Sequence, residues 1–123
     1  MLLDSNILIY GGKGEDPRLD VILDRFDLAV ASVTLVETLG FHGLSAEERH
    51  WLEITFERMR VLPLDSFVVR QAIALRQQRR IALADAIIAG TAMVHNLPLV
   101  TRNTADFRGI PGLQLVDPFT SPG

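Results

Sequence analysis

The stretch 83-LADAIIAGTAMVHNLPLVTRNTADF-107 joins two kinds of apolar pattern. Residues 84–95 carry alanine, glycine and isoleucine at helical spacing, and their small side chains allow a helix to lie close against a sheet. Residues 97–101 form a short apolar run, which is typical of a buried strand. One acid, Asp85, opens the helix, and another, Asp106, follows the strand. The stretch therefore predicts a helix, a buried strand and a polar turn, in that order.

The same alternation of strands and helices runs through the rest of the chain. The other predicted strands lie at residues 2–3, 28–31, 61–64 and 113–116. The other predicted helices lie at residues 16–26, 32–40, 45–60 and 66–78. Ser45 and Glu48 form a capping box, and Pro63 favours an edge position for its strand because proline cannot donate a ladder hydrogen bond. Short strands between helices predict a parallel sheet with helices on both faces.

The composition describes a folded globular protein. Its 123 residues, 48% of them hydrophobic and 22% charged, fit one domain over 1–123, with 118–123 as a flexible tail. The chain has no cysteine, no apolar run near the ~20 residues of a membrane span, and no basic start typical of a signal peptide. We therefore expect a cytoplasmic protein. The net charge of −3 argues against nucleic-acid binding by bulk attraction alone, although residues 66–84 contain four arginines and no acid.

The N-terminal segment 1-MLLDSNILIYG-11 places a carboxylate inside an apolar run. An unpaired ionised group is costly in such a place. Asp4 or Ser5 could cap a helix that starts near Asn6. Alternatively, it could be the first ligand of a pocket at the end of the strand at 2–3. The local sequence leaves both interpretations open.

Three other acids occupy comparable positions. Each lies on a strand-to-helix connection or in a helix that begins at the same end of the predicted sheet, Glu37 being five residues into its helix. With Asp4, they are Glu37, Asp85 and Asp106. Taken singly, Asp85 suits a helix dipole and Asp106 suits a turn. Clustered carboxylates repel one another unless protons or cations neutralise them. Because the chain has no cysteine and only three histidines, the expected cation is Mg²⁺ or Mn²⁺.

Four segments in this order and spacing resemble the PIN domain, and in particular the VapC-like toxins of bacterial toxin–antitoxin pairs. The segments are LLDSNIL (2–8), VETL (36–39), ALADAIIAGTA (82–92) and LVTRNTADF (99–107). The resemblance covers essentially the whole chain and implies a small α/β/α sandwich with Mg²⁺-dependent endoribonuclease activity, Mn²⁺ being a possible substitute. The family's acidic quartet falls on Asp4, Glu37, Asp85 and Asp106. Its polar residues around the metal fall on Asn6, Thr101 and Asn103.

The resemblance also implies partners. A metal-activated water would hydrolyse an RNA phosphodiester, and the candidate RNA contacts are Arg79, Arg80, Arg102 and Arg108. A solvated helix face is the alternative explanation for some of these arginines. Family members of this size pair as homodimers and are held inactive by an antitoxin, whose basic side chain an acidic pocket would attract.

Two other classes of protein compete with this interpretation. A phosphoryl-aspartate receiver or phosphatase also has a doubly wound sheet, an acid after the first strand and Mg²⁺. It needs a lysine late in the chain, however, whereas the single lysine is Lys13, and Asn6 stands where the phosphatase pattern has a second aspartate. The other alternative is a non-catalytic module that binds RNA or an antitoxin. Mg²⁺ binding separates that module from a nuclease.

Overall fold

A central parallel sheet organises the chain, of which a computed structural model describes residues 1–25 and 27–119. Its strands are β1 (Leu2–Leu3), β2 (Ala29–Ala31), β3 (Arg60–Leu62), β4 (Leu99–Val100) and β5 (Leu115–Val116). Their order in the sheet is β3-β2-β1-β4-β5, and every neighbouring pair is parallel. The edge position predicted for the strand at 61–64 is therefore confirmed, although β3 ends at Leu62 and Pro63 lies beyond it. The predicted helix end at Phe26 and residues 120–123 of the predicted tail lie outside the described residues.

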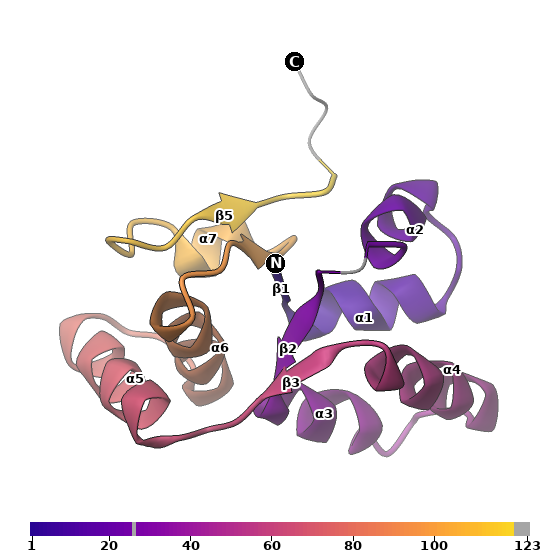
Figure 1. Cartoon of the computed structure of the whole chain (residues 1–123), viewed down its shortest axis with the longest axis horizontal. Coiled ribbons are helices and arrows are strands. Elements are labelled where there is room, and N and C mark those ends of the chain that lie inside the picture. Colours follow the sequence, from indigo (N-terminus) through magenta and orange to yellow (C-terminus); the bar gives the residue numbers. More distant parts are fainter. Residues whose placement is uncertain (26, 120–123) are drawn as a thin grey trace.

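Helices cover both faces of this sheet (Figure 1). They are α1 (Ser5–Gly12), α2 (Pro17–Leu23), α3 (Ser32–Leu39), α4 (Ala46–Glu57), α5 (Ser66–Gln78), α6 (Leu83–Val94) and α7 (Thr104–Phe107). Helices α5, α6 and α7 pack on one face, while α1, α2 and α4 pack on the other. The predicted α/β/α sandwich is confirmed. No helix in the described ranges is both long enough and apolar enough to span a membrane.

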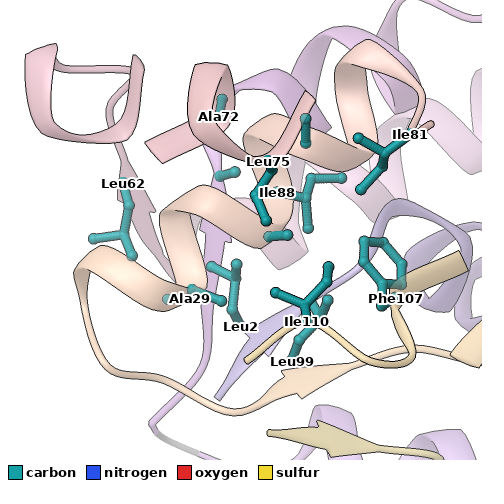
Figure 2. Close-up of a cluster of buried hydrophobic side chains, with 14 residues drawn as sticks. Leu2, Ala29, Leu62, Ala72, Leu75, Ile81, Ile88, Leu99, Phe107 and Ile110 are labelled. Carbon is teal, nitrogen blue, oxygen red and sulfur yellow. The ribbon is translucent and has the colours of Figure 1, made fainter. Parts of the chain in front are cut away.

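Successive strand residues supply the two hydrophobic cores, because side chains alternate between the faces of a sheet. Leu2 and Leu99 belong to the core beneath α5 and α6, whereas Leu3 and Val100 belong to the core beneath α1 and α4. Figure 2 shows the first core, in which strand side chains meet residues of α5 and α6, Phe107 of α7 and Ile110 after α7. All four strand residues are fully buried. Short strands suffice here because both faces of each strand are covered.

The small residues of α6 serve two interfaces. Ala86 and Ala89 are buried in the core that includes the strands, as their size predicts. Gly90 instead lies against α5: a β-carbon at that position would be 3.3 Å from the backbone nitrogen of Ala72 and 3.3 Å from the backbone oxygen of Val68. Helix α6 is thus held between the sheet and α5. This position fixes the start of α6, where Asp85 lies.

The strand order reverses beside β1. From β1 the chain proceeds outward to β2 and β3, and it then crosses to β4 and β5 on the other side of β1. In parallel α/β sheets, ligands bind beyond the carboxyl ends of the strands at such a reversal. Asp4 follows β1 directly, and Thr101 follows β4 directly. The topology therefore places the two segments around the candidate site next to each other.

Candidate active site

Asp4 both caps a helix and anchors the candidate site. Its carboxylate accepts a hydrogen bond from the backbone N–H of Ser5 at 2.8 Å, at the start of α1. Its second oxygen, Oδ2, accepts one from the hydroxyl of Thr101 at 2.8 Å. Asp4 is only 3% exposed, and this burial raises its pKa although both hydrogen bonds oppose the shift. The helix-cap and pocket interpretations of Asp4 therefore do not exclude each other.

Thr101 connects Asp4 to the segment that carries Asp106. Its hydroxyl oxygen accepts a hydrogen bond of 3.0 Å from the backbone N–H of Asn103. The Asn103 side-chain amide in turn donates to the carboxylate of Asp106 in α7. One continuous chain of hydrogen bonds thus runs from the end of β1 to α7. Two of the predicted polar residues, Thr101 and Asn103, form its middle.

Glu37 reaches the site from α3. It is exposed, and its Oε1 accepts a hydrogen bond of 2.6 Å from the hydroxyl of Ser5. The Ser5 oxygen also lies 3.2 Å from the hydroxyl of Thr34, one helical turn before Glu37. The sequence suggested Ser5 only as an alternative helix cap and gave Thr34 no role. The adjacency of Ser5 to Asp4 and the i, i+3 spacing of Thr34 and Glu37 were the available signals.

Asp85 lies in the first turn of α6 and is half-buried. Burial, followed by the negative charges of Asp4, Asp106 and Glu37, raises the pKa of Asp85 to about 6. Asp85 and Asp106 also line one pocket of about 270 Å³ between the start of α6 and α7. We refer to Asp4, Glu37, Asp85 and Asp106 as the acid cluster, because the charges of the other three act on the carboxyl group of Asp85.

The acid cluster is short of positive charge. Arginine–carboxylate ion pairs join Arg18 to Asp16 and Arg25 to Asp27, but no acid of the cluster forms such a pair within 1–25 and 27–119. Within the same residues, no group of three acidic or histidine side chains lies close enough together to coordinate a metal ion as the side chains are placed. The donors are all carboxylate oxygens, which suit a hard divalent cation. The negative charge and the carboxylate donors of the acid cluster therefore fit Mg²⁺ or Mn²⁺, although the described side chains do not surround a coordination site.

The remaining predicted residues lie around the acid cluster. Asn6 is exposed in α1 and makes no hydrogen bond to the cluster in the described residues. Arg79 donates to the backbone oxygens of Arg108 at 2.8 Å and Asp106 at 3.3 Å, so its guanidinium ties the end of α5 to α7. Arg80 is exposed beside Asp85 in the 270 Å³ pocket. An RNA contact remains a prediction for each arginine, and Arg79 has a structural role in addition.

An apolar groove of about 420 Å³ leads away from Glu37 between α1, α3 and α4. Its apolar lining includes Ile9 of α1, Phe41 after α3 and Leu52 of α4. Phe41 is 54% exposed and Ile9 is 37% exposed, whereas Leu52 is buried. Exposed aromatic and aliphatic side chains around such a groove are typical of a surface that contacts another protein.

Comparisons with known proteins agree with this architecture. Residues 1–113 match the PIN domain family. The chain is 33% identical over 131 aligned positions to "Ribonuclease VapC10" of Mycobacterium tuberculosis, covering 100% of this chain and 96% of that protein. It is 32% identical to the "tRNA(fMet)-specific endonuclease VapC" of Shigella flexneri, covering 94% and 96%. A solved toxin–antitoxin complex from Klebsiella pneumoniae contains a chain that superimposes with a TM-score of 0.81, at 30% identity, covering 96% of this chain and 97% of that one.

Proposed function

The chain belongs to the PIN domain family, and from this premise we propose that it is a metal-dependent endoribonuclease and the toxin of a toxin–antitoxin pair. One observation carries the proposal: Asp4, Glu37, Asp85 and Asp106 lie near one another at the reversal of strand order, where burial and then the charges of the other three acids raise the pKa of Asp85. The related proteins named as a ribonuclease and a tRNA endonuclease support the same chemistry. The nuclease would comprise the single domain expected over 1–123 and would act in the cytoplasm.

We propose that the acid cluster holds the metal. When bound, Mg²⁺ or Mn²⁺ would supply Lewis-acid activation of water and positive charge at the scissile phosphate. Asp4 is suited to this role because two hydrogen-bond donors fix its carboxylate. Ser5 orients Glu37, and Asn103 orients Asp106. Side chains held by such supporting hydrogen bonds keep ligands in position.

The reaction assigned to this site is hydrolysis. A water oxygen attacks the phosphorus, the P–O3′ bond breaks, and the products carry a 5′-phosphate and a 3′-hydroxyl. The RNA 2′-hydroxyl then takes no part as nucleophile. Arg80, Arg102 and Arg108 are exposed near the acid cluster and are our candidates for contacts with RNA phosphates.

The two competing classes fit less well. A phosphoryl-aspartate protein would need a lysine beside Asp4, whereas the single lysine, Lys13, follows the far end of α1. The family match also points away from that class. A non-catalytic binding module would have no need for four mutually repelling acids at one edge of the sheet, because like charges there destabilise the fold.

The antitoxin is the expected protein partner. The structural neighbour from Klebsiella pneumoniae was solved as a toxin–antitoxin complex. The apolar groove beside Glu37, with Phe41 exposed at its edge, suits an apolar segment of such a partner. A basic side chain at the end of that segment would then reach the acid cluster. We also expect the toxin itself to form a homodimer.

The decisive experiment compares the wild type with Asp85→Asn on RNA. This substitution keeps the shape of the side chain and removes one charge. We expect at least ~10²-fold slower cleavage, as when one electrostatic stabiliser is lost. The matched control is Glu53→Gln, an exposed acid on α4. RNA 5′-ends are sequenced and their phosphates identified; cleavage by folded Asp85→Asn at the wild-type rate would refute the proposal.

A further inference from the structure

The residues after β5 turn toward the segment that follows β4. Strands β5 and β4 lie side by side, and the backbone N–H of Thr101 donates to the carbonyl of Val116 at 3.0 Å. Immediately after β5, the Asp117 carboxylate accepts a hydrogen bond of 2.9 Å from the backbone N–H of Phe119, which is the pattern of an Asx turn. This turn brings an aromatic ring to the segment after β4.

The Phe119 ring contacts two arginines. Its centre lies 4.7 Å from the guanidinium carbon of Arg102 and 4.8 Å from that of Arg18. Arg102 also contacts the ring of Tyr10 at 5.1 Å, and Lys13 contacts the same ring at 5.8 Å. All four distances fall within the ~6 Å range of cation–π attraction. Two rings therefore hold the Arg102 guanidinium, one from α1 and one from the segment after β5.

Arg18 supports this arrangement in two ways. Its guanidinium donates to the backbone oxygen of Phe119 at 3.1 Å, which fixes the residue that carries the ring. It also donates to both carboxylate oxygens of Asp16, at 3.1 and 2.8 Å. Hydrogen bonds from Arg18, and then the charge of Arg102, lower the pKa of Asp16, so Arg102 lies within electrostatic reach of this acid. Because Arg18 occupies both oxygens of Asp16, that acid does not draw Arg102 away.

The Arg102 guanidinium keeps its donors available. It makes no hydrogen bond and no ion pair with any residue the structure describes, and its planar set of N–H donors matches the oxygens of a phosphate. It lines a pocket of about 250 Å³ together with Asn6, Tyr10 and Asn103. The Asn103 amide donates to the carboxylate of Asp106, which joins this pocket to the acid cluster. The guanidinium is therefore placed to bind a phosphate close to that cluster.

We propose that Phe119 is a positioning residue of the nuclease, whose ring, together with that of Tyr10, holds the Arg102 guanidinium where it binds a phosphate of the RNA substrate. This inference rests on the proposed nuclease function and assigns the segment after β5 a part in it. An exposed arginine side chain samples many rotamers, and fixing it upon binding costs free energy. The two rings fix the guanidinium before RNA arrives, so the phosphate contact costs less.

A purely structural role for Phe119 makes different predictions. Its side chain packs at the edge of the core beneath α1 and α4. Such packing needs apolar area but no ring, and its loss would act whether or not Arg102 is present. A role through Arg102 needs the ring and vanishes when the guanidinium is removed. A double-mutant cycle therefore separates the two roles.

The test measures kcat and KM for RNA cleavage in Phe119→Leu, Arg102→Gln and the double variant. We expect Phe119→Leu to raise KM about threefold, as for one exposed cation–π contact. We expect kcat to stay unchanged, because a phosphate contact of this kind stabilises bound substrate and transition state equally. Arg102→Gln should raise KM about tenfold, and adding Phe119→Leu to it should raise KM no further. Phe119→Tyr keeps a ring and should retain the wild-type KM.

Two kinetic outcomes would overturn the positioning role. One is a KM that Phe119→Leu leaves at the wild-type value. The other is a rise in KM that is equally large with and without the Arg102 guanidinium. Phe67→Leu is the matched control, since the Phe67 ring also contacts an arginine, Arg70, at 5.8 Å, but is 63% exposed at the start of α5 on the other face of the sheet. We expect a wild-type KM for this variant, and an equal rise in it would also reject the role.

A second variant keeps the test decisive if Phe119→Leu fails to fold. Arg18→Gln changes an exposed residue, removes one cation from the Phe119 ring and frees Asp16 to pair with Arg102. We expect it to raise KM in the wild-type background and to leave KM unchanged in the Arg102→Gln background. An unchanged KM in both backgrounds would overturn the proposal.

The position of the guanidinium is also measured without RNA. The NMR signal of the Arg102 Nε–H group is identified by its disappearance in Arg102→Gln. Because aromatic rings shield protons above their faces, Phe119→Leu should move this signal toward that of an unstacked arginine, whereas Phe119→Tyr should leave it in place. A signal that moves as expected in a protein that never cleaves RNA keeps the hold of the ring on Arg102 and rejects the nuclease. RNA cleavage together with a signal that Phe119→Leu does not move keeps the nuclease and rejects the positioning role.

Discussion

Thr101 donates a 2.8 Å hydrogen bond to Asp4 across β4 and β1, the two strands between which the strand order reverses. Both residues are buried, with exposures of 0% and 3%. The backbone N–H of Thr101 is itself bonded to the carbonyl of Val116 at the end of β5. The orientation of the Asp4 carboxylate therefore depends on residues that lie almost a full chain length away.

Replacing Thr101 with valine tests this dependence. Thr101→Val keeps the side-chain shape and leaves one oxygen of Asp4 without its donor. We expect a loss of about 1–3 kcal/mol in the free energy of unfolding together with slower RNA cleavage. Thr101→Ser retains the hydroxyl and should keep most of the activity. Chemical denaturation and cleavage rates provide the measurements, and a fully active, equally stable Thr101→Val would show that this bond is dispensable.

The dependence of activity on metal should follow the donor chemistry of the acid cluster. EDTA should abolish cleavage, and Mg²⁺ or Mn²⁺ should restore it. Ca²⁺ should restore it poorly, because its looser coordination suits in-line transfer less well. Cleavage that persists in EDTA would mean that the carboxylates do not drive the reaction.

Asp106 should be the most dispensable of the four acids. It is exposed on the four-residue helix α7. Asp4, by contrast, is buried at the start of α1, and Asp85 is half-buried in the first turn of α6. We expect Asp106→Asn to retain more activity than Asp85→Asn when both are assayed at the same Mg²⁺ concentration. A larger defect in Asp106→Asn would reverse this order and assign α7 the principal role.

Without metal, stability should change with pH in a direction set by Asp85. Its pKa is raised to about 6 in the folded protein, above the ~3.9 of an unfolded aspartate. The folded state thus binds a proton more tightly, so its stability falls as pH rises from about 4 to 6 and stays low above that range. Asp85→Asn should be as stable as the wild type or more stable at pH 7, and this advantage should vanish near pH 4. Melting curves in EDTA at pH 4 and pH 7 measure this difference in stability, with Glu53→Gln as the control. A strongly destabilised Asp85→Asn at pH 7 would contradict the repulsion between Asp85 and the other acids of the cluster.

Gly90 should tolerate no large side chain. A β-carbon there meets the α5 backbone at 3.3 Å, and backbone cannot move aside as a flexible side chain can. Gly90→Val should lower the free energy of unfolding by about 1–3 kcal/mol or more. Ala46→Leu, at the exposed start of α4, should change it little. Similar melting temperatures for Gly90→Val and the wild type would show that α5 and α6 can separate without cost.

Much of the fold could be predicted because its signals are local. The capping box of Ser45 and Glu48 is present as predicted, and Pro63 indicated the edge strand. The bond between Ser5 and Glu37 could not be predicted in the same way, because 32 residues separate the partners and only the folded sheet brings them together. Arg79 was predicted as an RNA contact from charge alone, whereas its bonds to backbone oxygens of α7 and Arg108 carry no sequence signal.

The acid cluster draws its members from positions 4, 37, 85 and 106, and the strand that supports Thr101 ends at Val116. No N-terminal portion of the chain that stops short of α7 contains all four acids. During synthesis, the cluster therefore stays incomplete until the segment that carries Asp106 has emerged from the ribosome. The cluster therefore forms only when segments from both sides of β1 have folded together, so no local piece of the chain can assemble it alone.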